Sequence, residues 1–253
     1  MIDTAFIGAT CPIGQYWTSK RYYDYLIDEE NLNLMRGKEF GQVVIICPSL
    51  WQGPIVTREQ VEWDTKFTET LINLLTEVKA ERVTFVTGLD LLEANGNEET
   101  PQLMESDDPY LANRIALRDF INLRFGRVLN VRVPELVEID GLFSVLDVIT
   151  KTPKTKKILP VSLLERHQLY PMTRIVNDVE KAWSCSLSSV NLVTEPMTTY
   201  EIVEKYFPAL SKKLPIAREL DPYGSARTSL YSKQYHDPDT GYIMSKNDLK
   251  IEV

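Results

Sequence analysis

The sequence predicts an α/β fold, a doubly wound parallel sheet with a small C-terminal lobe, on three observations. Apolar runs of strand length alternate with segments of helical periodicity along the first half of the chain. The run Val43–Cys47, bounded by Gly41 and Pro48, is apolar throughout and typical of a strand covered on both faces. The N-terminal strand runs directly into a turn that contains glycine. Alternation of this kind builds βαβ units, whose strands are parallel and whose crossovers are right-handed.

Four strands and three long helices are expected before residue 134. The strands are predicted at about residues 3–8, 42–47, 82–87 and 128–132, and the helices at about 13–27, 58–78 and 110–124. The segment between the first helix and the Val43 strand is short. Either Leu32–Leu34 is a remnant strand, or the whole stretch from Glu29 to Phe40 is helix and loop. The sheet is therefore expected to be a shortened one.

The character of the chain changes after Arg132. Prolines become frequent and the expected elements are short and mixed, with a helix at about 175–183, a strand at about 190–193 and a capped helix start at Thr198–Glu201. We therefore expect a sheet domain over residues 1–133 and a mixed α/β lobe over residues 134–253 that packs on it.

Composition excludes several classes of protein. The chain has 253 residues, of which 43% are hydrophobic and 25% charged, as is ordinary for a globular protein. A formal charge of −8 disfavours general binding to nucleic acid. Three cysteines without metal-ligand spacing and two histidines give no basis for a disulfide framework or a metal site. Because no apolar run has membrane length and the N-terminus does not read as a signal peptide, we expect a soluble, cytoplasmic protein.

The candidate binding site is the glycine turn between the first strand and the first helix. A dinucleotide site needs a tight turn, free backbone approach to the pyrophosphate, and a helix N-terminus directed at the negative charge. Gly8 and Gly14 fit the first and last glycine positions, and Thr10 and Ile13 complete the expected cofactor-binding residues. Cys11 stands where the middle glycine would be, so its side chain narrows the approach. The alternative is a turn that binds no ligand.

Further segments match, in order, the motifs of one enzyme family. They are GATCPIG at 8–14, QVVIICPS at 42–49, ERVTFVTGLDLL at 81–92, PYLANR at 109–114, RVP at 132–134, VNDV at 176–179 and NLVTEPMTTYE at 191–201. Over nearly its whole length the chain thereby resembles the extended short-chain dehydrogenase/reductases, the family of nucleotide-sugar epimerases, dehydratases and reductases. The resemblance implies a Rossmann-type sheet with a C-terminal substrate lobe, NAD or NADP as cofactor and a nucleotide-sugar as partner. A homodimer is one assembly that it allows.

The resemblance also implies a catalytic set. In this family a tyrosine exchanges a proton with the substrate oxygen, and a lysine four residues later supplies a positive charge. Tyr110 takes the place of the tyrosine, while Arg114 replaces the lysine and supplies charge without deprotonating. Gly88 aligns with the serine or threonine that usually orients the same oxygen. Thr87, one residue earlier, is the candidate to replace it if the strand end is irregular, because in a regular strand its side chain would be on the other face. For Tyr110 the alternative is a half-buried structural tyrosine.

Two further groups complete the expected site. Under the remnant-strand interpretation no acidic residue is placed to hold the adenosine ribose. Arg36 stands there instead and favours NADP through the 2′-phosphate. Substrate contacts are expected where the lobe passes the nucleotide, at Glu135, Arg166, Tyr170 and Arg174.

Three functions remain open from the sequence. The first is a divergent NAD(P)-dependent nucleotide-sugar epimerase or reductase, with Tyr110 as acid/base. The second is a non-catalytic relative that binds a nucleotide, a nucleotide-sugar or a partner protein for regulation or assembly. The joint changes at Cys11, Gly88 and Arg114 favour this second interpretation. The third is an enzyme that uses the sugar-binding lobe without a nicotinamide.

Overall fold

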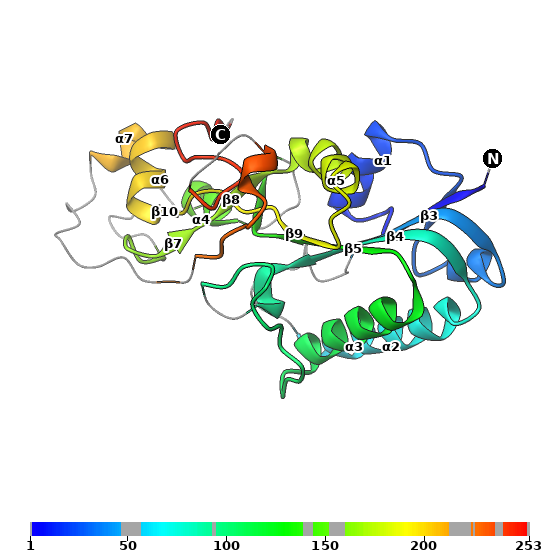
Figure 1. Ribbon diagram of the computed structural model, residues 1–253. Coiled ribbons are helices and arrows are strands. Elements are labelled where there is room, and N and C mark those ends of the chain that lie inside the picture. The colour runs from blue at the N-terminus through cyan, green and yellow to red at the C-terminus, as the bar shows by residue number, and fades with distance from the viewer. Residues whose placement is uncertain are drawn as a thin grey trace.

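A central parallel sheet, with helices on both faces and a smaller lobe beside it, makes up the computed structural model (Figure 1). The structure describes residues 2–46, 57–92, 95–138, 144–151, 160–212, 224, 226–235 and 240–251. In Figure 1 the lobe lies beyond the carboxyl ends of the central strands, and the N-terminus lies beyond their amino ends.

Within the described residues the sheet has six strands, and every neighbouring pair is parallel. Their spatial order is β2 (Tyr25–Ile27), β1 (Thr4–Ile7), β3 (Glu39–Ile46), β4 (Lys79–Gly88), β5 (Val128–Val133) and β9 (Ser189–Asn191). The four strands expected from the sequence, β1, β3, β4 and β5, lie side by side and parallel, so this part of the prediction is confirmed. Cys47, the last residue of the strand predicted at 42–47, lies outside the described part of the chain.

The middle of β3, at Val43–Ile46, is apolar on both sides because helices cover both faces of the sheet. One face carries α1 (Pro12–Lys20) and α5 (Ile175–Ser184), and the other carries α2 (Arg58–Leu75) and α3 (Pro109–Arg124) (Figure 1). Alternate side chains enter separate buried clusters: Val44 packs with the α1 and α5 residues, and Ile45 packs with the α2 and α3 residues. Both clusters remove apolar surface from water, which is the main favourable term in folding.

The first helix is shorter than expected. It ends at Lys20, and Tyr25–Ile27 forms the edge strand β2, so the predicted helix over residues 13–27 is wrong in its second half. The Asp24 carboxylate accepts hydrogen bonds from the backbone N–H of Thr4 (2.8 Å) and from its hydroxyl (2.9 Å), which aligns the chain with β1. Tyr22, just after the end of the helix, is 80% exposed, so it does not continue the buried face of α1.

The described segment between β2 and β3 contains no strand. Leu32–Met35 forms the short 3-10 helix η1, so the strand interpretation of Leu32–Leu34 is wrong. The helix-and-loop alternative holds as far as Lys38, whereas Glu39 and Phe40 belong to β3. Leu32 and Met35 are buried against the α2 side of the sheet, which explains their apolar character without a strand.

The second half of the chain builds the lobe and then returns to the sheet. The lobe elements are β6 (Glu135–Val137), α4 (Val145–Lys151), β7 (Arg166–His167), β8 (Leu169–Pro171), β10 (Met197–Thr198), α6 (Thr199–Tyr206) and α7 (Pro208–Ser211). Strand β6 pairs with β8, and β7 pairs with β10. Because α5 and β9 belong to the sheet layers, the sheet takes one helix and one strand from beyond the expected boundary at residue 133. No helix in the described ranges is both long and apolar enough to cross a membrane.

We predict that Gly14→Ala strongly destabilises the fold. A Cβ on Gly14 would lie 2.0 Å from the carbonyl oxygen of Gly8, where only a shift of backbone could relieve the clash. Alanine is otherwise the better helix residue, so the loss, about 3 kcal/mol in the free energy of unfolding, would come from this contact alone. Urea unfolding measures it.

The matched control is Gly126→Ala, because a Cβ there meets no atom within 4 Å. That variant should stay within about 0.5 kcal/mol of the wild type, or be slightly more stable. Equal losses in the two variants would contradict the close approach of α1 to β1.

Candidate functional site

The glycine turn, between β1 and α1, lies against the end of β2. Gly8 has φ +92°, a backbone conformation that glycine adopts readily and other residues rarely. The N–H groups of Gly8 and Ala9 both donate to the carbonyl of Ile27, at 2.9 and 3.2 Å. The turn is therefore fixed beside the residues that follow β2.

Cys11 caps α1 through its side chain. The Gly14 N–H donates to Cys11 Sγ at 3.2 Å, and Pro12 has no N–H to offer. Burial raises the pKa of the Cys11 thiol to about 12, so the group is neutral near pH 7. Part of the donor capacity that a helix N-terminus offers to a phosphate is thus used within the protein.

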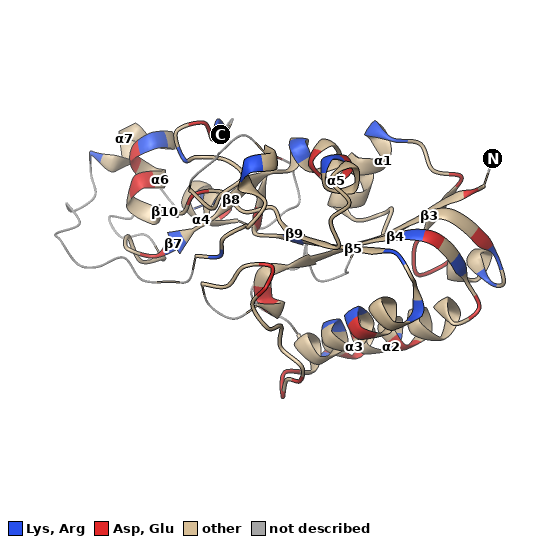
Figure 2. Ribbon diagram, viewed as in Figure 1, with Lys and Arg blue, Asp and Glu red and all other residues tan. Residues whose placement is uncertain are grey.

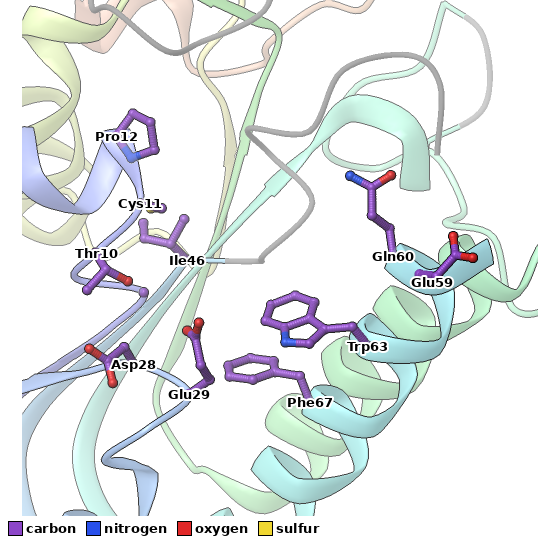
Figure 3. Close-up of a pocket in the computed structure, with 11 residues that line it drawn as sticks. Thr10, Cys11, Pro12, Asp28, Glu29, Ile46, Glu59, Gln60, Trp63 and Phe67 are labelled. Carbon is purple, nitrogen blue, oxygen red and sulfur yellow. The ribbon is translucent and has the colours of Figure 1, made fainter. Parts of the chain in front are cut away.

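A cavity of about 470 Å³ opens at the carboxyl ends of β1 and β3 (Figure 3). Its described lining comes from the glycine turn, the end of β3, the segment after β2 and the first turns of α2. The residues are Gly8, Thr10, Cys11, Pro12, Asp28, Glu29, Ile46, Glu59, Gln60, Trp63 and Phe67. Of the expected cofactor-binding residues, Gly8, Thr10 and Cys11 line this cavity, whereas Ile13 and Gly14 are fully packed behind them.

The lining of the cavity is acidic and aromatic. Asp28, Glu29 and Glu59 contribute carboxyl groups, and neither lysine nor arginine occurs in its described lining. Trp63 and Phe67 stack with ring centroids 5.3 Å apart and ring planes 14° apart. Figure 3 shows both rings projecting from α2 toward the side that carries Asp28 and Glu29. The aromatic rings suit a flat ring of a ligand, and the carboxylates suit hydroxyl groups. An unscreened polyphosphate would be repelled by these carboxylates.

Asp28 is the residue that sequence reasoning missed. It directly follows β2, and its Oδ1 accepts the Glu30 N–H at 3.0 Å, while its own N–H donates to Asn31 Oδ1 at 2.9 Å. In dinucleotide-binding folds an acidic residue about 20 positions beyond the first glycine holds the adenosine ribose. That spacing was visible in the sequence, but the helix predicted through Ile27 concealed the strand that precedes Asp28.

Arg36 does not occupy the ribose position. It follows η1, forms a salt bridge with Glu77, and is absent from the cavity lining. The inference that favoured NADP rested on a strand over Leu32–Leu34, and those residues belong to a 3-10 helix.

Tyr110 and Arg114 are in contact at the start of α3. The Arg114 Cζ lies 3.4 Å from the centroid of the Tyr110 ring, and Arg114 Nη1 donates to the Tyr110 carbonyl. Arg114 Nε lies 3.7 Å from a carboxylate oxygen of Asp90, just beyond β4, and the arginine side chain is only 2% exposed. The cation is therefore held over the face of the half-buried phenol ring. Neither residue lines the cavity beside Gly8.

Thr87 is buried near the end of β4, level with Arg132 of β5. Strand alternation places it on the same sheet face as Phe85, which packs with residues of α2 and α3. Gly88 follows as the residue before the 3-10 helix η3 (Leu89–Leu91). Like Tyr110, neither residue is part of the cavity lining.

The expected substrate residues divide into two structural networks. Tyr170 is fully buried, and its hydroxyl donates to Asp178 at 2.8 Å, so it has no surface left for a ligand. Arg174 donates to both oxygens of Asp178, at 3.1 and 3.3 Å. Tyr170 was expected to contact substrate where the lobe passes the nucleotide, whereas its buried hydroxyl is hydrogen-bonded to α5, the helix that follows η4 (Met172–Arg174).

Glu135 and Arg166 lie elsewhere in the lobe. Glu135 Oε1 contacts His167 Nδ1 at 2.7 Å, and its other oxygen accepts the Val145 N–H at the start of α4. His167 Nε2 meets the fully buried Thr199 hydroxyl at 2.9 Å. Arg166, in β7, is exposed, and its backbone pairs with that of Thr198 in β10. These two residues are not brought together with Tyr170 and Arg174 into one site.

Comparison with known proteins gives similarity at the level of structure. No family model matches the chain, and no curated protein matches it. A dTDP-4-dehydrorhamnose reductase from Bacillus anthracis, solved with NADP, is 11% identical over 97% of this chain and 91% of that chain, with a TM-score of 0.62. A UDP-galactose 4-epimerase is 16% identical over 95% and 94%, with a TM-score of 0.65. MoeE5, solved with UDP-glucuronic acid and NAD, is 14% identical over 92% and 91%, with a TM-score of 0.64.

These structures match almost the whole chain, including the lobe. At such low identity the similarity concerns the fold, and it agrees with the fold that the sequence motifs implied. The protein has a Rossmann-like α/β fold, shared with solved reductases and epimerases of nucleotide-sugars.

Proposed function

We propose that this protein is a divergent NAD-dependent relative of the nucleotide-sugar epimerases and reductases, with the cavity beside Gly8 as its cofactor site. The observation that carries the proposal is Asp28, which follows β2 and lines the same cavity as the glycine turn. A carboxylate there accepts hydrogen bonds from both ribose hydroxyls of an unphosphorylated adenosine and repels a 2′-phosphate. NAD is accordingly preferred to NADP.

The remaining lining supports the adenosine half of the cofactor. The stacked rings of Trp63 and Phe67 offer an apolar platform for a base, and Trp63 is still 38% exposed in the open cavity. The pyrophosphate would lie at the N-terminus of α1, where the helix dipole favours negative charge. Cys11 weakens this end of the site because its sulfur accepts the Gly14 N–H.

The substrate assignment rests on fold similarity and on the lobe. MoeE5, similar in fold, is described in complex with UDP-glucuronic acid or UDP-glucose. The lobe of this chain lies at the carboxyl side of the sheet, where ligands of open α/β sheets bind (Figure 1). We therefore assign a nucleotide-sugar as the substrate class.

Tyr110 is the proposed acid/base. When bound, the nicotinamide supplies hydride transfer, and Tyr110 exchanges the proton with the substrate oxygen. Arg114 remains charged throughout, so it acts by electrostatic attraction on the phenol and does not relay the proton. Asp90 helps to hold the guanidinium over the ring.

Asp28→Asn tests the cofactor site. The amide oxygen can still accept the Glu30 N–H, so the loop should keep its conformation while the charge is lost. We expect NAD affinity, measured by calorimetry, to fall about tenfold because a hydrogen bond to a charged acceptor is lost. The ratio of NADP to NAD affinity should rise, since the charge opposing a 2′-phosphate is gone.

Glu30→Gln is the control, since Glu30 is exposed in the same loop and outside the cavity lining. It should bind NAD as the wild type does. An Asp28→Asn variant with unchanged affinity for both cofactors would remove the basis of the proposed site.

Cys11→Gly should tighten NAD binding. The change releases the Gly14 N–H toward the pyrophosphate and opens the approach to the turn, worth about fivefold in affinity. The protein should lose about 1–2 kcal/mol of stability because a buried side chain is removed. Cys11→Ser keeps an acceptor for Gly14 and should leave the affinity near that of the wild type. Equal affinities for the glycine and serine variants would contradict this account.

A non-catalytic nucleotide-binding relative is the second candidate. It is favoured by the position of Arg114, whose charge lies over the Tyr110 ring face and whose Nη1 is engaged with the Tyr110 carbonyl. Tyr110→Phe distinguishes the two functions because it preserves the ring beneath the guanidinium and removes only the hydroxyl.

If the first function holds, turnover of a nucleotide-sugar in the presence of NAD should fall by about a hundredfold to ten-thousandfold in Tyr110→Phe, with little change in Tm. The second function predicts no turnover in the wild type and equal NAD affinity in both proteins. Turnover that is equal in the two proteins would remove Tyr110 from the mechanism.

A further inference from the structure

A second cavity, of about 450 Å³, lies at the opposite edge of the sheet, where β1, β3 and β4 begin. Its size falls in the range of small-molecule sites. Three arginines line it, Arg21, Arg82 and Arg127, together with Gln42 and one acidic residue, Glu81. Figure 2 shows basic positions at the start of β4 and just before β5, next to each other at this edge. The cavity is therefore basic, in contrast to the one beside Gly8.

The sheet itself brings these side chains together. Gln42 is level with Arg82 in the register of β3 and β4, and the Val83 N–H donates to the Arg127 carbonyl at 2.9 Å. The guanidinium carbons of Arg82 and Arg127 lie 5.4 and 5.5 Å from the ring centroid of Trp183. The cations of Arg82, in β4, and Arg127, just before β5, thus approach one aromatic ring of α5, although two like charges so close together repel.

The charge of this cluster is only partly balanced. Arg21 forms a salt bridge with Glu180, but neither Arg82 nor Arg127 forms one with any residue that the structure describes. Burial, followed by the like charges of Arg21 and Arg127, lowers the pKa of Arg82. An anion in the cavity would remove this repulsion.

Gln42 supplies an independent indication of a ligand. Its Oε1 accepts from Arg21 Nη2 at 3.1 Å and from Arg82 Nη2 at 2.7 Å. Because a guanidinium only donates, these two bonds fix which end of the amide is oxygen. The Nε2 group is left without a hydrogen-bond partner among the described residues, although Gln42 is only 2% exposed and lines the cavity. A buried donor in this position costs free energy unless an acceptor satisfies it.

We propose that this cavity binds a small phosphate-bearing anion, with Arg82, Arg127 and Gln42 Nε2 as its donors. Arginine forks match the oxygens of a phosphate group, and the amide adds one further donor. A single carboxylate would leave more of the positive charge unbalanced than a phosphate dianion would. The site is separate from the proposed cofactor cavity and does not depend on it.

Calorimetry with inorganic pyrophosphate, at constant ionic strength in chloride, tests the proposal. The wild type should show saturable binding to one site and a rise in Tm when pyrophosphate is added. In Arg127→Gln the affinity should fall about tenfold or more, because a charged donor is lost at an exposed position where folding is not at risk. Arg58→Gln is the matched control, since Arg58 is an exposed arginine of α2 outside the cavity.

Gln42→Glu gives the sharpest contrast. The carboxylate still accepts from Arg21 and Arg82, but it replaces the free donor with negative charge. We expect unchanged or higher Tm without pyrophosphate, and pyrophosphate affinity at least about tenfold lower. Absence of saturable binding in the wild type would overturn the proposal. Equal affinity in Arg127→Gln and Arg58→Gln would also overturn it, because pyrophosphate would then be bound elsewhere, such as at the glycine turn.

Discussion

The contact between the start of α1 and the end of β1 holds the first helix against the sheet. Gly14 rests directly on the carbonyl of Gly8, closer than any side chain would permit. This contact brings Trp17 onto the sheet, where Phe6 meets Trp17 and Tyr23 edge to face, at centroid distances of 5.7 and 5.1 Å. It also directs the first turn of α1 at the carboxyl edge of the sheet, so that the same pair of glycines serves packing and the candidate site.

Charge is divided between the two edges of the sheet. The carboxyl edge carries Asp28, Glu29 and Glu59 around a cavity with aromatic walls, and the amino edge carries the arginine cluster. A net charge of −8 conceals this division, because the sum says nothing about where each sign lies. The acidic edge suits ribose hydroxyls and a base, and the basic edge suits a phosphate. The two cavities therefore differ in the chemistry that each can accept.

The sequence predicted the centre of the sheet better than its edge and its site. Strand segments covered on both faces are mostly apolar, which makes the buried runs of β3 and β4 conspicuous in the sequence. The short edge strand β2 has one exposed face, and its Tyr25 and Leu26 fit a helical pattern equally well. Because β2 was not predicted, the residue expected to hold the ribose was Arg36, whereas the structure has Asp28 after β2. The sequence spacing placed Tyr110 and Arg114 one helical turn apart, but whether the cation would meet the hydroxyl or the ring face depends on side-chain packing. The complete burial of Tyr170 likewise depends on Asp178 and α5, which no local pattern reveals.

The position of β9 has a consequence for how the chain is made. Strand β5 is complete by Val133, yet its second neighbour, β9, begins only at Ser189, after the lobe strands β6, β7 and β8. During synthesis the edge of β5 that later pairs with β9 therefore keeps unpaired backbone groups until the lobe residues have been made. An exposed apolar strand edge can pair with other chains, which makes this interval the most vulnerable to aggregation. Glu98 connects β9 to the C-terminal segment. Its carboxylate accepts hydrogen bonds from the Asn191 N–H, the Ser229 hydroxyl and the Leu230 N–H. The last strand of the central sheet and the C-terminal segment thus close over an edge that the first half of the protein cannot cover alone.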